Sequence, residues 1–180
     1  SNNNSNKVLE NVQSNPLNGK SIDYVSTFIN SIINSSKGMK NQEGNGENQK
    51  NTMIKSLKEL LKNLINYDKK LNSNGTNLST KAKIKALITS LKEQIEYIQS
   101  LNMELVYKYQ NINDLNTFIK SKLDSNNILL ERNNVKNTNI KRSIIELEAM
   151  KYALYANNNK INISKMINKI DKEVIKLKKK

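Results

Sequence analysis

Cysteine, histidine and tryptophan are absent from this chain of 180 residues, and Pro16 is its only proline. Without cysteine or histidine there is no thiol nucleophile, no disulfide, no histidine general base and no ligand set for a zinc finger or a thiolate-bound iron–sulfur cluster. Several large classes of enzyme are therefore excluded. We expect a protein that is not an enzyme, with no catalytic residue, no metal site, no cofactor and no small-molecule substrate.

Long apolar runs are missing as well. The longest ones, such as Ile128 to Leu130, span a few residues, whereas a membrane-spanning helix needs about 20. We therefore expect no transmembrane segment. The chain starts at Ser1 with a polar Asn/Ser tract, as expected of a mature or trimmed chain, and the removal of an upstream signal peptide stays an open alternative.

Asparagine (33), lysine (28) and isoleucine (21) supply 82 of the 180 residues, and the formal net charge is +14. Residues 134–180 alone carry +8, from 12 basic and 4 acidic residues. Such a field attracts polyanions of any kind. Nucleic acid is disfavoured as a partner, because Arg132 and Arg142 are the only arginines and the aromatic content is 5%.

The basic residues near the C-terminus are candidates for a binding surface: Lys169, Lys172, Lys176, Lys178, Lys179 and Lys180. Two interpretations stay open for them. They form either a functional basic surface or a solvated face whose lysine content reflects the residue bias of a genome rich in A and T.

Apolar residues recur at helical spacing along most of the chain. This pattern predicts four amphipathic helices, over about 21–37, 52–72, 80–131 and 136–178. Ser21 is the expected N-cap of the first, and Asn74-Gly75 the end of the second. Residues 1–20 are predicted to be a flexible tail with a short apolar turn, and the glycine-rich residues 38–51 a loop.

The third helix is predicted to be the longest. Twelve positions from 84 to 123 alternate steps of four and three, and ten of them are apolar or tyrosine, the exceptions being Asn102 and Asn116. This predicts one continuous helix of about 50 residues. After a tight turn at Asn133-Asn134, the fourth helix is expected to kink or restart near Asn162, because its apolar row shifts by two residues there.

These elements predict an all-α protein, an elongated antiparallel four-helix bundle with long third and fourth helices. The alternative is an open helical hairpin that completes its core with a second chain. The oligomeric state stays undetermined at this stage.

Polar residues interrupt the apolar rows at Asp68, Asn102, Asn116 and Lys151. One interpretation is that they are buried and set the register of the helices at a cost in stability. The other is that they face outward at the ends of the bundle, or that a proteome rich in asparagine tolerates them there. A loose bundle of this kind could also open and lay its apolar rows on a lipid surface, with lysines toward the headgroups.

A cysteine-free, Asn/Lys/Ile-rich chain of this length, patterned as a polar-rich four-helix bundle, resembles the sporozoite microneme protein family essential for cell traversal of malaria parasites. The resemblance covers about Lys7 to Lys180, rests on composition and architecture, and carries over no functional residue. It implies storage in micronemes, secretion, and a role in crossing host cells, exerted at host membranes or through a protein partner.

We therefore expect a non-enzymatic secreted protein whose partner is an anionic membrane surface or a host or parasite protein. The alternatives are a structural coiled-coil or scaffold protein, a surface-ligand interaction domain, and, less favoured, a nucleic-acid binder.

Overall fold

The computed structural model describes residues 4–38, 46–131, 137–157 and 163–180, and every regular element in these ranges is an α-helix. The predicted all-α class is confirmed. The predicted number of four helices is wrong, because the described residues form eight helices. The chain divides into two compact units: unit 1 comprises Ser1–Lys37 and Glu47–Gln99, and unit 2 comprises Gly38–Gly46 and Ser100–Lys180.

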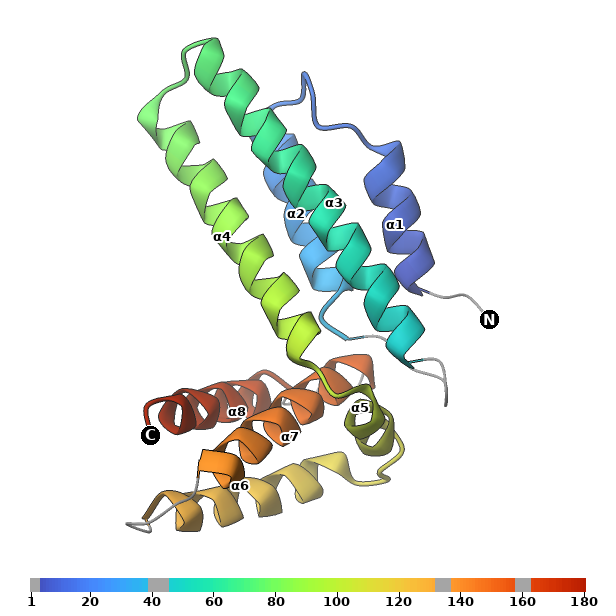
Figure 1. The fold of residues 1–180 in the computed structure, drawn as a ribbon, viewed down its shortest axis with the longest axis vertical. Coiled ribbons are helices and arrows are strands. Elements are labelled where there is room, and N and C mark those ends of the chain that lie inside the picture. The colour runs from blue at the N-terminus through green and yellow to red at the C-terminus, as the bar shows by residue number, and fades with distance from the viewer. Residues whose placement is uncertain (1–3, 39–45, 132–136, 158–162) are drawn as a thin grey trace. The chain divides into compact units, whose positions relative to one another are not determined.

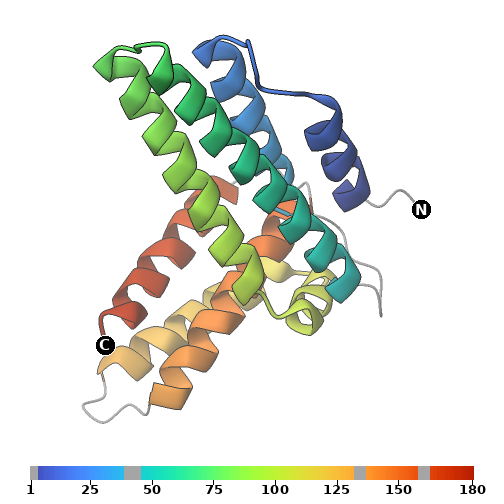
Figure 2. The same ribbon diagram turned by 45° about the horizontal axis from the view of Figure 1, so that its top comes forward.

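Unit 1 is built from α1 (Asn4–Ser14), α2 (Ile22–Ser35), α3 (Gly46–Ser73) and α4 (Leu78–Ser100). These helices lie side by side in Figure 1, and the view in Figure 2 agrees. Their apolar rows meet in one core, whose fully buried members include Val25, Ile29, Met53, Leu57, Leu60, Leu64, Ile84 and Leu91. Helical spacing predicted this face of α3 in part: Leu57 and Leu64 are buried as expected, whereas Ile54 and Leu61 are half-buried and Met53 is a core residue that the predicted row left out.

Local signals set most helix ends in unit 1. Ser21 is the N-cap of α2, as predicted, and its Oγ accepts a hydrogen bond from the backbone N–H of Tyr24 at 3.1 Å. Gly75 has a φ of 72° in the turn between α3 and α4, a conformation that glycine adopts without strain. The predicted end of α3 at Asn74-Gly75 is thus confirmed.

Two segments differ from the prediction. Residues 4–14 form α1 rather than a tail and a turn, since Val8 and Val12 are buried and tertiary packing stabilises a helix too short to persist alone. α3 begins at Gly46, so the last residues of the predicted loop 38–51 are helical. Residues 39–45 of that loop lie outside the described ranges.

Unit 2 contains α5 (Met103–Gln110), α6 (Leu115–Glu131), α7 (Asn137–Ala156) and α8 (Ile163–Lys178). α7 is its central helix and packs against α5, α6 and α8 (Figure 1). Residues on several sides of α7 are buried, among them Leu147, Ala149, Met150, Tyr152, Ala153 and Leu154. A helix covered on several sides has no single apolar stripe, which explains the weak amphipathic pattern of this segment.

The prediction of a single helix over 80–131 is wrong. The chain forms α4, α5 and α6 there, with breaks at residues 101–102 and 111–114. Asn102 Oδ1 accepts a hydrogen bond from the N–H of Leu105 at 3.0 Å and caps α5. Asp114 accepts hydrogen bonds from Thr117 N–H at 3.1 Å and Thr117 Oγ1 at 2.7 Å at the start of α6. Side chains that satisfy the first N–H groups of a helix favour a new start over continuation.

The single helix predicted over 136–178 is also replaced, by α7 and α8. α7 ends at Ala156 and α8 begins at Ile163, which agrees with the restart rather than the kink. The intervening residues 158–162 and the predicted turn at Asn133-Asn134 lie outside the described ranges.

Candidate functional site

The exposed face of α8 carries a regular row of lysines. Its buried row is Ile167, Ile170, Val174 and Leu177. Lysines follow the same spacing two residues later, which is about 200° around the helix. These four exposed lysines and Lys165, which precedes them in the sequence, form what we call the lysine row: Lys165, Lys169, Lys172, Lys176 and Lys179.

Neither acidic residue of α8 is a fully exposed member of the lysine side. Asp171 pairs with Lys151 of α7, whose Nζ lies 2.8 Å from Asp171 Oδ1. Glu173 is buried, with 5% of its surface exposed. This side of α8 therefore carries a net positive charge, although Glu173 and Asp124 of α6 line the same groove as three of its lysines.

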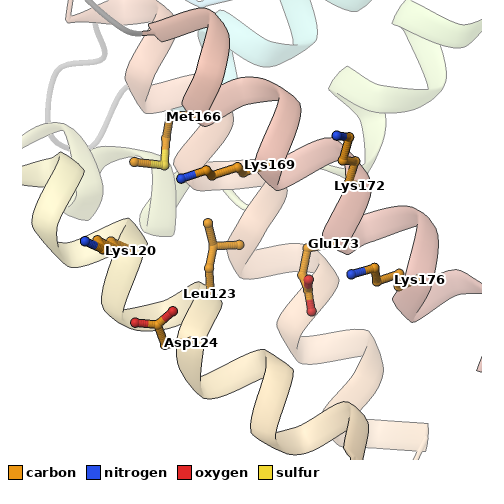
Figure 3. A pocket seen from close by; sticks show the side chains of 8 residues that line it. All are labelled: Lys120, Leu123, Asp124, Met166, Lys169, Lys172, Glu173 and Lys176. Carbon is orange, nitrogen blue, oxygen red and sulfur yellow. The ribbon is translucent and has the colours of Figure 1, made fainter.

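A groove of about 270 Å³ lies between α6 and α8 within unit 2. α6 contributes Lys120, Leu123 and Asp124, and α8 contributes Met166, Lys169, Lys172, Glu173 and Lys176. In Figure 3, Lys169 extends from α8 toward α6, and the Glu173 carboxylate lies between the two helices. The groove is thus lined by lysines from two helices and by the apolar side chains of Leu123 and Met166.

Glu173 is the unusual member of this groove. Its Oε1 atom is buried and has no hydrogen-bond partner among the described residues. Burial raises the pKa of Glu173, because the charged form loses hydration, while the charge of Lys176 opposes that rise. A buried acceptor in a groove wall is a place where a ligand's donor would be stabilised.

The four polar residues that interrupt the apolar rows do not form a common site. Asp68 is half-buried on α3 in unit 1, while the other three belong to unit 2. Asn102 and Asn116 are exposed, so of the two interpretations the outward-facing one holds for them. Lys151 is half-buried and forms the interhelical ion pair with Asp171 described above.

The six candidate lysines separate into two groups. Lys169, Lys172 and Lys176 line the groove. Lys178 instead lies 3.8 Å from Glu148 Oε1 of α7, and Lys179 and Lys180 are exposed at the end of the chain.

Sequence reasoning missed the contribution of α6 to the groove, since nothing in the local pattern shows which helix packs beside α8. It also missed Glu173, although a signal was present. Met166, Ile170, Glu173 and Leu177 are spaced by four, three and four residues, which places a carboxylate on a mostly apolar row.

A second polar cluster in unit 2 involves Tyr109 of α5, Lys122 of α6 and Glu146 of α7. Tyr109 donates a hydrogen bond to Glu146 Oε2 at 3.5 Å, and Lys122 Nζ lies 3.4 Å from the same oxygen. Burial and the neighbouring Glu146 charge raise the pKa of Tyr109, which therefore stays protonated. This cluster links three helices of unit 2.

Comparisons with known proteins give no family for the chain. No protein-family model matches it, no curated protein matches it and no solved structure matches it. Within the described ranges, no helix is both long enough and apolar enough to cross a bilayer, and no three side chains of metal-binding type gather. The functional interpretation therefore depends on the chemistry of the lysine row and the groove.

Proposed function

We propose that this chain is a non-enzymatic helical protein that binds anionic membrane surfaces through the lysine row of α8. The observation that carries the proposal is the separation of charge on that helix. Five lysines, the last of them directly after the end of α8, are exposed on one side, whereas Asp171 is paired with Lys151 and Glu173 is buried. A face of this kind suits a flat surface of dispersed negative charge.

The expected affinity is modest and sensitive to salt. Each lysine held near an anionic membrane contributes about 1 kcal/mol, so the row contributes about 5 kcal/mol, which corresponds to dissociation constants between about 0.1 and 1 mM. Ile175 is 54% exposed beside Lys172 and Lys176, and its burial among lipid chains would add to this. Screening by salt at higher ionic strength would weaken the lysine contribution.

Nucleic acid carries the same sign of charge but is less well matched. α8 contains no arginine for bidentate contacts and no aromatic residue for base stacking. Lysine stems, in contrast, suit a membrane interface, because their apolar part can lie against lipid while the ammonium group reaches the headgroups.

The test is co-sedimentation of the full chain with vesicles of phosphatidylcholine alone or with about one third phosphatidylserine. We expect binding only to the anionic vesicles, and loss of most of that binding when Lys165, Lys169, Lys172 and Lys176 are changed to Gln.

A matched control exists on α3, where Lys55, Lys58, Lys62 and Lys69 are also exposed. Their change to Gln removes the same charge and should leave most of the binding in place. Equal losses in the two variants would overturn the role of α8 and leave only a net-charge effect.

The biological setting of this activity follows from the resemblance alone. We propose that the protein is secreted by a parasite and acts on the membrane of a host cell that the parasite crosses. The specific expectation is that the full chain releases a trapped dye from anionic vesicles at low salt. Binding without release would separate surface attachment from membrane disruption and argue against the opening of the helices on lipid.

A further inference from the structure

The groove between α6 and α8 differs from the rest of the lysine row in its geometry. Lys165 and Lys179 do not line it, whereas Lys169, Lys172 and Lys176 of α8 and Lys120 of α6 do. A ligand in the groove could therefore contact ammonium groups from both helices. Such a two-sided arrangement can select a compact anion rather than a flat charged surface.

The size of the groove limits the ligand. Pockets for drug-sized molecules have volumes of about 300–1,000 Å³, and this groove measures about 270 Å³. It would hold a headgroup or a small metabolite but not an extended chain. Four ammonium groups and two carboxylates line it, a net charge of +2 when both acids are ionised.

The carboxylates limit the chemistry further. Glu173 Oε1 is buried without a hydrogen-bond partner among the described residues, and Asp124 is exposed at the same groove. A ligand made only of acceptor oxygens would leave Glu173 unpaired and be repelled by it. A ligand with hydroxyl groups could donate to both acids while its anionic groups accept from the lysines.

We infer that the groove between α6 and α8 binds a phosphorylated polyol, either as the headgroup of a membrane lipid or as the free compound. Its phosphates accept hydrogen bonds from lysines on both helices, a ring hydroxyl donates to Glu173 Oε1, and its C–H edges face Leu123 and Met166. This inference rests on the proposed function in one respect, since it names the headgroup that the lysine row would select.

The first experiment compares two soluble anions of similar charge by isothermal titration calorimetry with the full chain at physiological ionic strength. Inositol 1,4,5-trisphosphate has hydroxyl groups, and tripolyphosphate has no C–OH donors. We expect the inositol compound to bind at least about tenfold more tightly, the value for one charge-assisted hydrogen bond. Equal affinity would overturn the inference.

The Glu173→Gln variant tests the source of that preference. An amide has a donor as well as an acceptor, so the variant should accommodate tripolyphosphate and reduce the preference to near parity. If the variant still binds the inositol compound tenfold more tightly than tripolyphosphate, Glu173 does not distinguish the two anions, and its assigned role is overturned.

A pair of double variants tests the location. Lys120→Gln with Lys169→Gln removes one ammonium group from each side of the groove and should lower affinity for the inositol compound by about tenfold or more. Lys108→Gln with Lys141→Gln removes the same charge from exposed positions on α5 and α7 that do not line the groove. Equal losses of affinity in the two double variants would mean that the lysines act only through the net charge, and would overturn the location of the site in the groove.

Vesicles distinguish the two sources and separate this inference from the proposed function. Tighter binding to vesicles with phosphatidylinositol 4,5-bisphosphate than to phosphatidylserine vesicles of equal surface charge identifies the lipid. Binding of the free inositol compound without any vesicle binding supports the groove and overturns the proposed function. Vesicle binding together with equal affinity for the two soluble anions supports the proposed function and overturns the inference about the groove.

Discussion

At the scale of single residues, Glu173 is a buried carboxylate whose position lowers the stability of the fold. It lies on the buried face of α8 and is 5% exposed, and its Oε1 has no hydrogen-bond partner among the described residues. Burial of an unpaired acceptor destabilises a folded protein by about 1–3 kcal/mol. An apolar residue here would extend the row of Ile170 and Leu177, so packing alone does not favour a carboxylate at this position.

The change Glu173→Gln should stabilise the protein by about 1 kcal/mol at neutral pH. Because the pKa of Glu173 is raised by folding, the folded state binds more protons than the unfolded state between the ordinary glutamate pKa of 4.5 and the raised value. Stability from this group is then present at low pH and lost as pH rises through that window. The gain from Gln should therefore grow with pH and then level off, as measured by urea unfolding at a series of pH values.

Glu104 provides the control for that measurement, because it is exposed on α5. The change Glu104→Gln should leave the pH profile unaltered. A Glu173→Gln variant that is less stable than the parent at neutral pH would mean that the carboxylate has a favourable partner in the folded state.

At the scale of helices, the segment 80–131 shows how an unbroken apolar period can still be divided. The two polar positions in its row lie at the two breaks: Asn102 caps α5, and Asn116 is in the first turn of α6 behind Asp114. The apolar period continues across both breaks, since Ile95, Ile98, Tyr109 and Ile119 are all buried. If the Asn and Asp residues of this segment are first considered as N-caps, the sequence predicts these two helix starts.

The change Asn102→Ala should lower the free energy of unfolding by about 1 kcal/mol, because it removes the acceptor for the Leu105 N–H. Chemical denaturation measures this directly. The matched variant Asn116→Ala alters an exposed asparagine that is not a cap, and should change stability by less than about 0.5 kcal/mol. Equal costs for the two changes would contradict the capping role of Asn102.

At the scale of the whole molecule, the chain has two hydrophobic cores rather than the single bundle predicted. Leu64 is fully buried in unit 1, and Ile170 is fully buried in unit 2. Each unit therefore has its own source of stability, and the lysine row and groove depend on the core of unit 2.

Leu64→Ala and Ile170→Ala should each destabilise their own unit by about 2–5 kcal/mol, through lost burial and the cavity left behind. Native-state hydrogen exchange resolves the two effects. Leu64→Ala should speed amide exchange mainly in α2, α3 and α4, and Ile170→Ala mainly in α6, α7 and α8. Faster exchange throughout the chain in either variant would show that the two units unfold as one.

The sequence by itself determined the helical class, part of the buried faces of the helices, the Ser21 cap, the Gly75 turn and the concentration of lysines towards the C-terminus. These features depend on interactions between residues about two to five positions apart, which periodicity and capping rules describe. Tertiary structure decided that residues 4–14 form a helix, that the chain has two cores, and that α6 lies beside α8. Lys120 and Lys169 are 49 residues apart, and the groove between them exists only because packing sets how those two helices meet.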